Sequence, residues 1–126
     1  MFQVTDHTLI LRVTPTVNND TGATDISTIS ATLNGNLTLV GRDTATVFFC
    51  WGNSDAGATT PSAWENVAPA GDMTATGSFS NTVRNLTPAM TYCYRTFATN
   101  TYGSSWSAAP ATFATPPLSG PVLMIR

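Results

Sequence analysis

The sequence contains no lysine, and only 10% of its residues are charged. Its five cations are arginines spread along the chain, and the formal net charge is −2. Nucleic-acid binders gain much of their affinity by neutralising phosphates with clustered cations, so we expect no nucleic-acid partner. The same lack argues against binding to an anionic membrane surface. No apolar run approaches the roughly 20 residues of a spanning helix, so we expect no membrane insertion.

The sequence is equally poor in catalytic side chains. Its single histidine, His7, lies in the N-terminal segment, and its two cysteines are Cys50 and Cys93. A thiol nucleophile needs a nearby base, and two cysteines without a spaced histidine or a second pair make no zinc site. The acids are scattered over separate loops, which does not suit paired-carboxylate hydrolysis. Calcium binding by loop acids is a minor alternative. We expect no catalytic residue, no cofactor and no metal, and therefore no enzyme.

Helical periodicity is also missing, because no stretch of a dozen residues repeats apolar positions at a spacing of 3.6. Short β-branched and aromatic runs alternate instead with Gly, Asn, Asp and Pro, which is typical of an antiparallel sandwich. These runs predict strands at residues 8–14, 15–19, 26–40, 44–52, 62–68, 75–84, 90–100 and 105–115. Loops are predicted at residues 41–43, 52–60, 68–72 and 100–105, and the low-charge segment 55–63 is expected to be a flexible loop.

Several motifs carry a resemblance to a known family. In order, the matching residues are Ala31, Leu33, Gly35, Val47, Phe49, Trp51, Gly52, Leu86, Pro88, Tyr92, Tyr94, Arg95, Ala98, Asn100 and Gly103. Together with "SSWS" at 104–107, they resemble a fibronectin type III-like domain of the kind repeated in bacterial surface proteins. The resemblance implies an all-β, immunoglobulin-like antiparallel sandwich of about seven strands over residues 15–115. Residues 1–14 would add an N-terminal strand, and 116–126 a C-terminal apolar tail. Such scaffolds host many functions, so the fold alone names none.

The two faces of the central strands can be told apart, because side chains alternate along a strand. In 44–51 the odd-numbered set has no polar member, so it is expected in the core. In 92–98 the even-numbered set faces inward, because the odd set holds Arg95 and burying an unpaired guanidinium is costly. The core residues expected on this basis are Val47, Phe49, Trp51, Tyr92 and Tyr94. By the resemblance, Tyr92 forms the tyrosine corner, with its hydroxyl bonded to nearby backbone.

Cys50 and Cys93 fall in the outward-facing sets of these two strands. The resemblance makes the strands antiparallel neighbours, so the cysteines can lie directly opposite one another. Their Cα atoms would then be about 4.5–5.5 Å apart, which a disulfide can span. We therefore expect a Cys50–Cys93 disulfide on the outer face of one sheet. Free, partly covered thiols and a bridge between subunits are the alternatives.

Two further features have a functional and a structural interpretation. Trp64 and Trp106 offer flat faces on which a sugar can stack, although packing is the more common use of such residues. A surface glycan or protein is thus an expected partner class only as an alternative. Asn19, Asn36 and Asn85 each begin an N-x-T sequon, which permits N-glycosylation in a suitable host.

The two ends of the chain depart from the resembled domain. Leu9, Ile10 and Leu11 form one continuous apolar run, and a second one consists of Val122, Leu123, Met124 and Ile125. Continuous apolar runs are typical of strands buried on both faces, and a monomer that exposes them risks aggregation. They either extend and cover their own sandwich or lead into a further domain. Alternatively, at least one adds as a strand to a neighbouring copy.

These features favour a non-enzymatic, extracellular structural subunit at the cell surface. Its copies would associate through their termini into a filament or layer, so other copies are the main expected partner. A lysine-free, Thr-rich surface suits such a crowded structure better than a protein that depends on mixed charge for solubility. The alternatives are a binding or adhesion module, a virion decoration protein, or one domain of a larger secreted protein, including an accessory domain of a glycan hydrolase.

Overall fold

The structure, a computed structural model, describes residues 13–118 of the 126-residue chain and is almost entirely β. The strands are β1 (Thr16–Asn18), β2 (Ala31–Leu39), β3 (Ala45–Gly52), β4 (Asn66–Met73), β5 (Gly77–Val83), β6 (Thr91–Asn100), β7 (Gly103–Trp106) and β8 (Ala111–Ala114). One turn of 3₁₀ helix, η1 (Pro61–Ala63), precedes β4. Within these residues no helix has the length and apolarity needed to cross a membrane.

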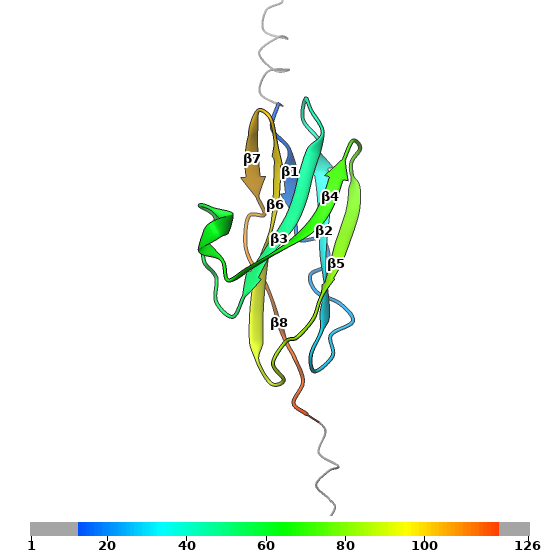
Figure 1. Ribbon diagram of the computed structural model, residues 1–126. Helices are drawn as coiled ribbons and strands as arrows, with labels where there is room; N and C mark the ends of the chain where they lie inside the picture. The colour runs from blue at the N-terminus through cyan, green and yellow to red at the C-terminus, as the bar shows by residue number, and fades with distance from the viewer. Residues whose placement is uncertain (1–12, 119–126) are drawn as a thin grey trace, which may run out of the picture.

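The strands form two facing antiparallel sheets (Figure 1). The smaller sheet has the order β1-β2-β5. The larger one has the order β4-β3-β6-β7, with β8 also paired to β6 beyond the end of β7. The predicted all-β antiparallel sandwich is therefore confirmed. The extra N-terminal strand and the C-terminal tail stay predictions, because most of their residues lie outside the described part.

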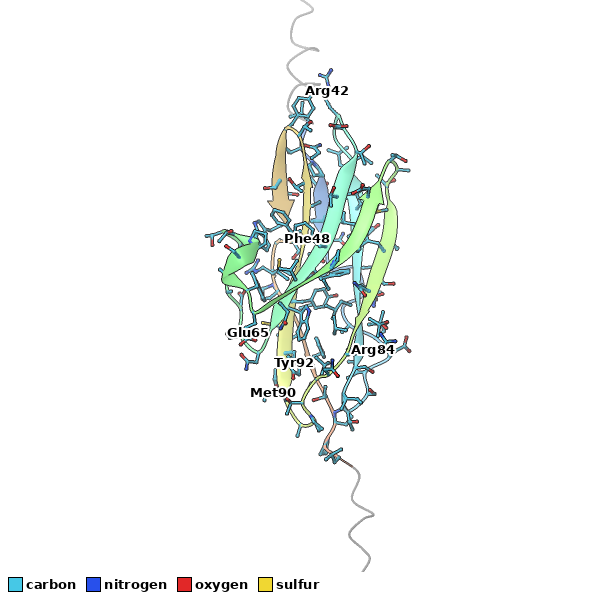
Figure 2. The ribbon with its side chains drawn as sticks, viewed as in Figure 1. Arg42, Phe48, Glu65, Arg84, Met90 and Tyr92 are labelled. Atoms are coloured by element: carbon cyan, nitrogen blue, oxygen red, sulfur yellow. The ribbon has the colours of Figure 1, made fainter. Side chains whose placement is uncertain are left out.

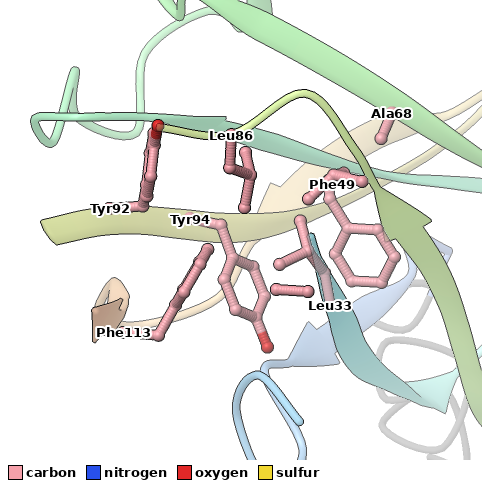
Figure 3. Close-up of a cluster of buried hydrophobic side chains, with 9 residues drawn as sticks. Leu33, Phe49, Ala68, Leu86, Tyr92, Tyr94 and Phe113 are labelled. Atoms are coloured by element: carbon pink, nitrogen blue, oxygen red, sulfur yellow. The ribbon is translucent and has the colours of Figure 1, made fainter. Parts of the chain in front are cut away.

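The core lies between the sheets and follows the alternation of the sequence. From β3 it takes Ala45, Val47 and Phe49, and from β6 it takes Tyr92, Tyr94, Thr96 and Ala98. Phe49 packs edge-on against Tyr94, with ring centroids 5.6 Å apart (Figure 3). Trp51 is only half buried, and packs at the rim of the core against Tyr92 at 5.9 Å. Phe49 also packs against Phe79 of β5, with ring centroids 5.4 Å apart, so an aromatic contact joins the larger sheet to the smaller one.

Two predicted boundaries are wrong for local reasons. Residues 68–72, expected as a loop, form the second half of β4. Their proline, Pro69, is tolerated because β4 is an edge strand and needs no donor on its free side. Opposite Val47 and Phe48, the strand carries a bulge at Ala70, which the turn formers of this segment accommodate. The single strand expected at 105–115 is instead two strands, β7 and β8, separated by residues 107–110.

The turn before β6 carries local strain. Tyr92, the tyrosine assigned to the corner, accepts a hydrogen bond through its hydroxyl from the Thr87 backbone N–H at 2.8 Å. Between these residues, Ala89 has a φ of 55°, a left-handed value that glycine adopts at no steric cost. The Ala89 N–H donates to the Pro116 carbonyl at 3.1 Å, so this turn also holds the chain where it leaves the sandwich.

We predict that Ala89→Gly raises the free energy of unfolding by about 1 kcal/mol, because the relief of left-handed strain exceeds the added entropy of the unfolded chain. Urea unfolding followed by tryptophan fluorescence measures the change. Ala75→Gly, in the exposed turn between β4 and β5, is the matched control and should bring no gain. Equal loss of stability in both variants would show that the Ala89 turn is not strained.

Candidate interaction surfaces

The larger sheet carries a second apolar cluster on its outer face, away from the core. Phe48 and Phe97 lie opposite one another on β3 and β6, with ring centroids 4.9 Å apart. Phe97 in turn contacts Trp106 on β7 at 4.5 Å. Cys50, Cys93 and Trp64 are buried beside these rings. We call this set, Phe48, Cys50, Trp64, Cys93, Phe97 and Trp106, the outer cluster.

A loop formed by residues 53–65 covers the outer cluster (Figure 1). Trp64 turns its ring into the cluster and donates from Nε1 to the Gly57 carbonyl at 3.0 Å. Arg95 forms a two-pronged ion pair with Asp55, with Nε–Oδ1 and Nη2–Oδ2 distances of 3.1 Å. These contacts tie the loop to the sheet at Asp55 and Trp64, on either side of most of the segment 55–63 that was expected to be flexible. Hydrogen bonding to Arg95 holds the pKa of Asp55 below its ordinary value.

Glu65 closes the base of this loop. Its Oε1 accepts a hydrogen bond from the Asn53 backbone N–H at 2.9 Å, so the residues that open and close the loop are joined. The same oxygen lies 2.5 Å from the point where a Cβ on Gly52 would sit, so a larger residue at the end of β3 would require the Glu65 carboxylate to move. Sequence reasoning missed the Arg95–Asp55 pair and the Glu65–Asn53 bond, although an outward-facing Arg95 without an obvious partner was a signal for the first of them.

The expected disulfide is absent, and the two cysteines are free. Cys50 pairs across the strands with Arg95, and Cys93 pairs with Gly52, so the thiols are diagonal rather than opposite. Diagonal positions are about 7–8 Å apart, beyond the usual span of a disulfide. Both cysteines do point away from the core, yet the covering loop buries them. Burial raises the pKa of Cys50 to about 11 and also raises that of Cys93.

Neither tryptophan proposed for sugar stacking presents an open face. Trp64 is only 5% exposed, beneath its own loop. Trp106 is half buried and meets the ring of Phe97 edge-on. Residues 13–118 contain no pocket and no group of three or more potential metal ligands. What this face offers a partner is therefore a smooth surface and not a cleft.

Asn19, one of the three predicted glycosylation acceptors, uses its side-chain amide for hydrogen bonds within the sandwich. Its Oδ1 accepts from the Thr96 backbone N–H at 3.1 Å and from Thr96 Oγ1 at 2.7 Å. Its Nδ2 donates to the Ala109 carbonyl at 2.7 Å. The side chain thus fills the gap between β7 and β8, where β6 has no strand partner. A sugar on Nδ2 would displace that amide from Ala109.

The other two sequons differ in exposure. Asn36 is half buried on β2, between Asn18 and Ser78 of the neighbouring strands. Asn85 is exposed in the turn after β5, with a φ of 63°. Asn85 therefore offers the most accessible acceptor of the three, and its glycosylation stays a prediction.

Large exposed apolar side chains gather at one end of the sandwich. The described residues expose five of them, namely Ile26, Ile29, Val67, Tyr102 and Leu118. The 84–90 turn donates hydrogen bonds to the carbonyls of Ile29 and Pro116. Leu118 follows Pro116 by two positions, and Ile26 precedes Ile29 by three. Figure 2 shows Met90 towards this end and Arg42 at the opposite end, where residue 13 lies. The apolar runs 9–11 and 122–125 lie outside the described residues.

Comparison with known proteins identifies the fold and little else. No family model and no curated protein matches the sequence. Among solved structures, the sensor domain of the anti-sigma factor RsgI4 of Pseudobacteroides cellulosolvens is similar over 83% of this chain and 92% of its own, at 21% identity and a TM-score of 0.52. The sixth fibronectin type III domain of a human fibronectin type III domain containing protein is similar over 85% of both chains, at 24% identity and 0.52. The chain has a fibronectin type III-like fold.

We predict that both thiols resist alkylation in the native protein. A pKa of about 11 for Cys50, against an ordinary value of 9.0, lowers its thiolate fraction at pH 8 about 100-fold. Iodoacetamide labelling followed by intact mass measures the rate. Trp64→Ala should accelerate labelling by uncovering the cluster, whereas Tyr102→Ala, an exposed aromatic at the tip of the β6–β7 turn, should not. Labelling of the parent as fast as free cysteine would contradict the covered geometry.

We predict that Asn19→Ala lowers the free energy of unfolding by about 1–2 kcal/mol, because the hydroxyl of the fully buried Thr96 loses its acceptor, whereas the Thr96 N–H keeps Ser107 Oγ. Asn19→Asp keeps the acceptor for Thr96 and should cost less. Asn36→Ala removes a half-buried asparagine of the other sheet and should change stability by about 0.5 kcal/mol or less. Chemical unfolding of the three variants gives these values, and equal effects at positions 19 and 36 would refute the role of Asn19.

Proposed function

We propose that this fibronectin type III-like module is a non-enzymatic structural subunit whose copies associate end to end, in a filament or layer outside the cell. The observation that carries the proposal is the position of the two chain ends. Residues 13 and 118 lie at opposite ends of the elongated sandwich (Figure 1). An apolar run at 9–11 precedes residue 13 in the sequence, and another at 122–125 follows residue 118. Segments leaving from opposite ends reach different neighbours, so they favour a linear assembly.

The edges of the sheets support strand addition at one place in particular. β4 is a protected edge, because it carries Pro69, a bulge and Asp72. β5 is an edge of the smaller sheet with seven residues, and it has no proline and no charge. Half of its backbone groups point away from β2, its sheet partner, and an added strand would satisfy them. The terminal segments are candidates for that strand.

The polar surface also fits a crowded assembly. The outer face of the smaller sheet is lined by hydroxyl and amide groups without charge. Thr32 and Thr82 are hydrogen bonded across β2 and β5 at 3.0 Å, and Thr16 and Thr38 across β1 and β2 at 2.6 Å. A neutral face of this kind allows copies to lie close together without repulsion between like charges. Burial of both thiols beneath the 53–65 loop makes unpaired cysteines compatible with oxidising surroundings.

Sedimentation velocity of three proteins tests the proposal: the full chain, residues 13–126 and residues 1–118. These boundaries retain the Val13 carbonyl, which accepts from Arg42 N–H and Asn100 Nδ2, and the Pro116 carbonyl bonded to Ala89. We expect the full chain to form larger species as its concentration rises. Removal of at least one terminal segment should yield a monomer of unchanged thermal stability. If all three proteins are equally stable monomers, self-association is excluded and a binding module becomes the better interpretation.

A further inference from the structure

Three exposed apolar residues at the C-terminal end of the sandwich lie on two segments, 26–30 and 115–118, that are both hydrogen bonded to the 84–90 turn. We call Ile26, Ile29 and Leu118 the end surface; they are 36%, 54% and 70% exposed. The turn that carries Ile29 is fixed by its serines, because Ser27 Oγ accepts from the backbone N–H groups of both Ile29 and Ser30. The Ile29 carbonyl accepts from the Leu86 N–H at 2.9 Å. Ile29 is thus held outward by backbone bonds, and little order is lost when something covers it.

Leu118 is held beside this turn by the chain that leads to it. Thr115 donates from its backbone N–H to the Met90 carbonyl and from Oγ1 to the Thr87 carbonyl, at 3.0 and 2.6 Å. The Ala89 N–H bonds Pro116, at the position where the left-handed strain lies. Two consecutive prolines, Pro116 and Pro117, favour an extended path at this point. The exit of the chain is therefore fixed to the 84–90 turn, which is also bonded to the Ile29 carbonyl.

We propose that the end surface receives the apolar run Leu9–Ile10–Leu11 of a second copy. This inference rests on the proposed self-association and names the two surfaces that meet. Residues 9–11 stand two to four positions before Val13, so an extended chain carries them at most about 14 Å from it. β6 alone, with ten residues, spans roughly 33 Å along the sandwich. The run cannot reach the end surface of its own copy, and only a neighbour can receive it.

Charge supports this pairing of segments. The apolar run is followed by Arg12 and preceded by Asp6 and His7. Asp25 directly precedes Ile26 in the sequence, and Arg84, labelled in Figure 2, follows β5 at the start of the 84–90 turn. The apolar run and the end surface therefore each have one acidic and one basic residue nearby. Opposite charges can pair across the contact and fix the orientation of the run on the end surface. The resulting contact joins different surfaces of the two copies, so it propagates into a filament instead of closing a dimer.

Two single substitutions in the full chain test the contact from its two sides. Ile29→Thr alters the end surface, and Ile10→Thr alters the inserted run. Each should raise the concentration at which half of the protein is assembled by tenfold or more. Val67→Thr is the matched control, because Val67 is an exposed β-branched residue on β4, outside the end surface. It should leave assembly unchanged, and thermal unfolding should show that all three variants are folded.

Mixing the two defective variants gives the sharpest result. Ile29→Thr retains an intact run, and Ile10→Thr retains an intact end surface, so an equimolar mixture should form heterodimers that do not grow. Each variant alone should sediment as a monomer. A mixture that stays monomeric, or that forms long polymers, would overturn the assignment.

The remaining outcomes separate this inference from the proposed function. If Ile29→Thr assembles like the parent while deletion of residues 1–12 abolishes assembly, self-association stands and the end surface is wrong. If Ile29→Thr impairs assembly and deletion of 119–126 does so as well, while Ile10→Thr does not, the occupant is the C-terminal run and the assignment to residues 9–11 fails. If the unsubstituted chain is monomeric at every concentration, both the proposed self-association and the proposed contact are wrong.

Discussion

The side chain of Asn19 fills a gap in the larger sheet on which the closure of the sandwich depends. β6 is paired with β7 along its second half and with β8 along its first half, and neither strand pairs with its middle. The N–H of Thr96, a fully buried residue, faces that gap, and a buried backbone donor without a partner is costly. Asn19 Oδ1 and Ser107 Oγ both accept from it. Because Asn19 follows β1 directly, its bonds join the first strand to β6 and, through Ala109, to the segment between β7 and β8.

The same region gathers further long-range bonds around Tyr94. Its hydroxyl donates to the Asn34 carbonyl at 2.6 Å, across the core from the larger sheet to β2. The Asn34 side chain in turn donates to the Gly22 carbonyl and to Thr24, and so anchors the segment between β1 and β2. Burial raises the pKa of Tyr94 to about 12, so this donor stays protonated across the physiological range. One buried tyrosine and two asparagines therefore connect three strands that are distant in sequence.

The outer cluster explains why β3 reads as a continuous apolar run. A strand with one face in water alternates polar and apolar residues, whereas Phe48, Phe49, Cys50 and Trp51 are all apolar. Phe49 and Trp51 pack towards the core, and Phe48 and Cys50 pack beneath the 53–65 loop. The strand is covered on both faces, once by the other sheet and once by its own following loop. The sides of the sandwich thus bury most of their large apolar side chains, and such groups reach solvent mainly at one end.

By itself the sequence determined the fold, the inward faces of β3 and β6, and the outward direction of both cysteines, because these follow from alternation and from local motifs. It did not determine that the cysteines are diagonal and buried, since strand register and the path of the 53–65 loop depend on contacts between distant residues. The sequence also did not predict the hydrogen bond between Asn19 and Thr96, because these residues are 77 positions apart. An asparagine after a short strand has the same sequence pattern whether its side chain is hydrated or bonded to a distant strand. Only the tertiary structure brings those partners together, and it alone placed Ile26, Ile29 and Leu118 on one surface.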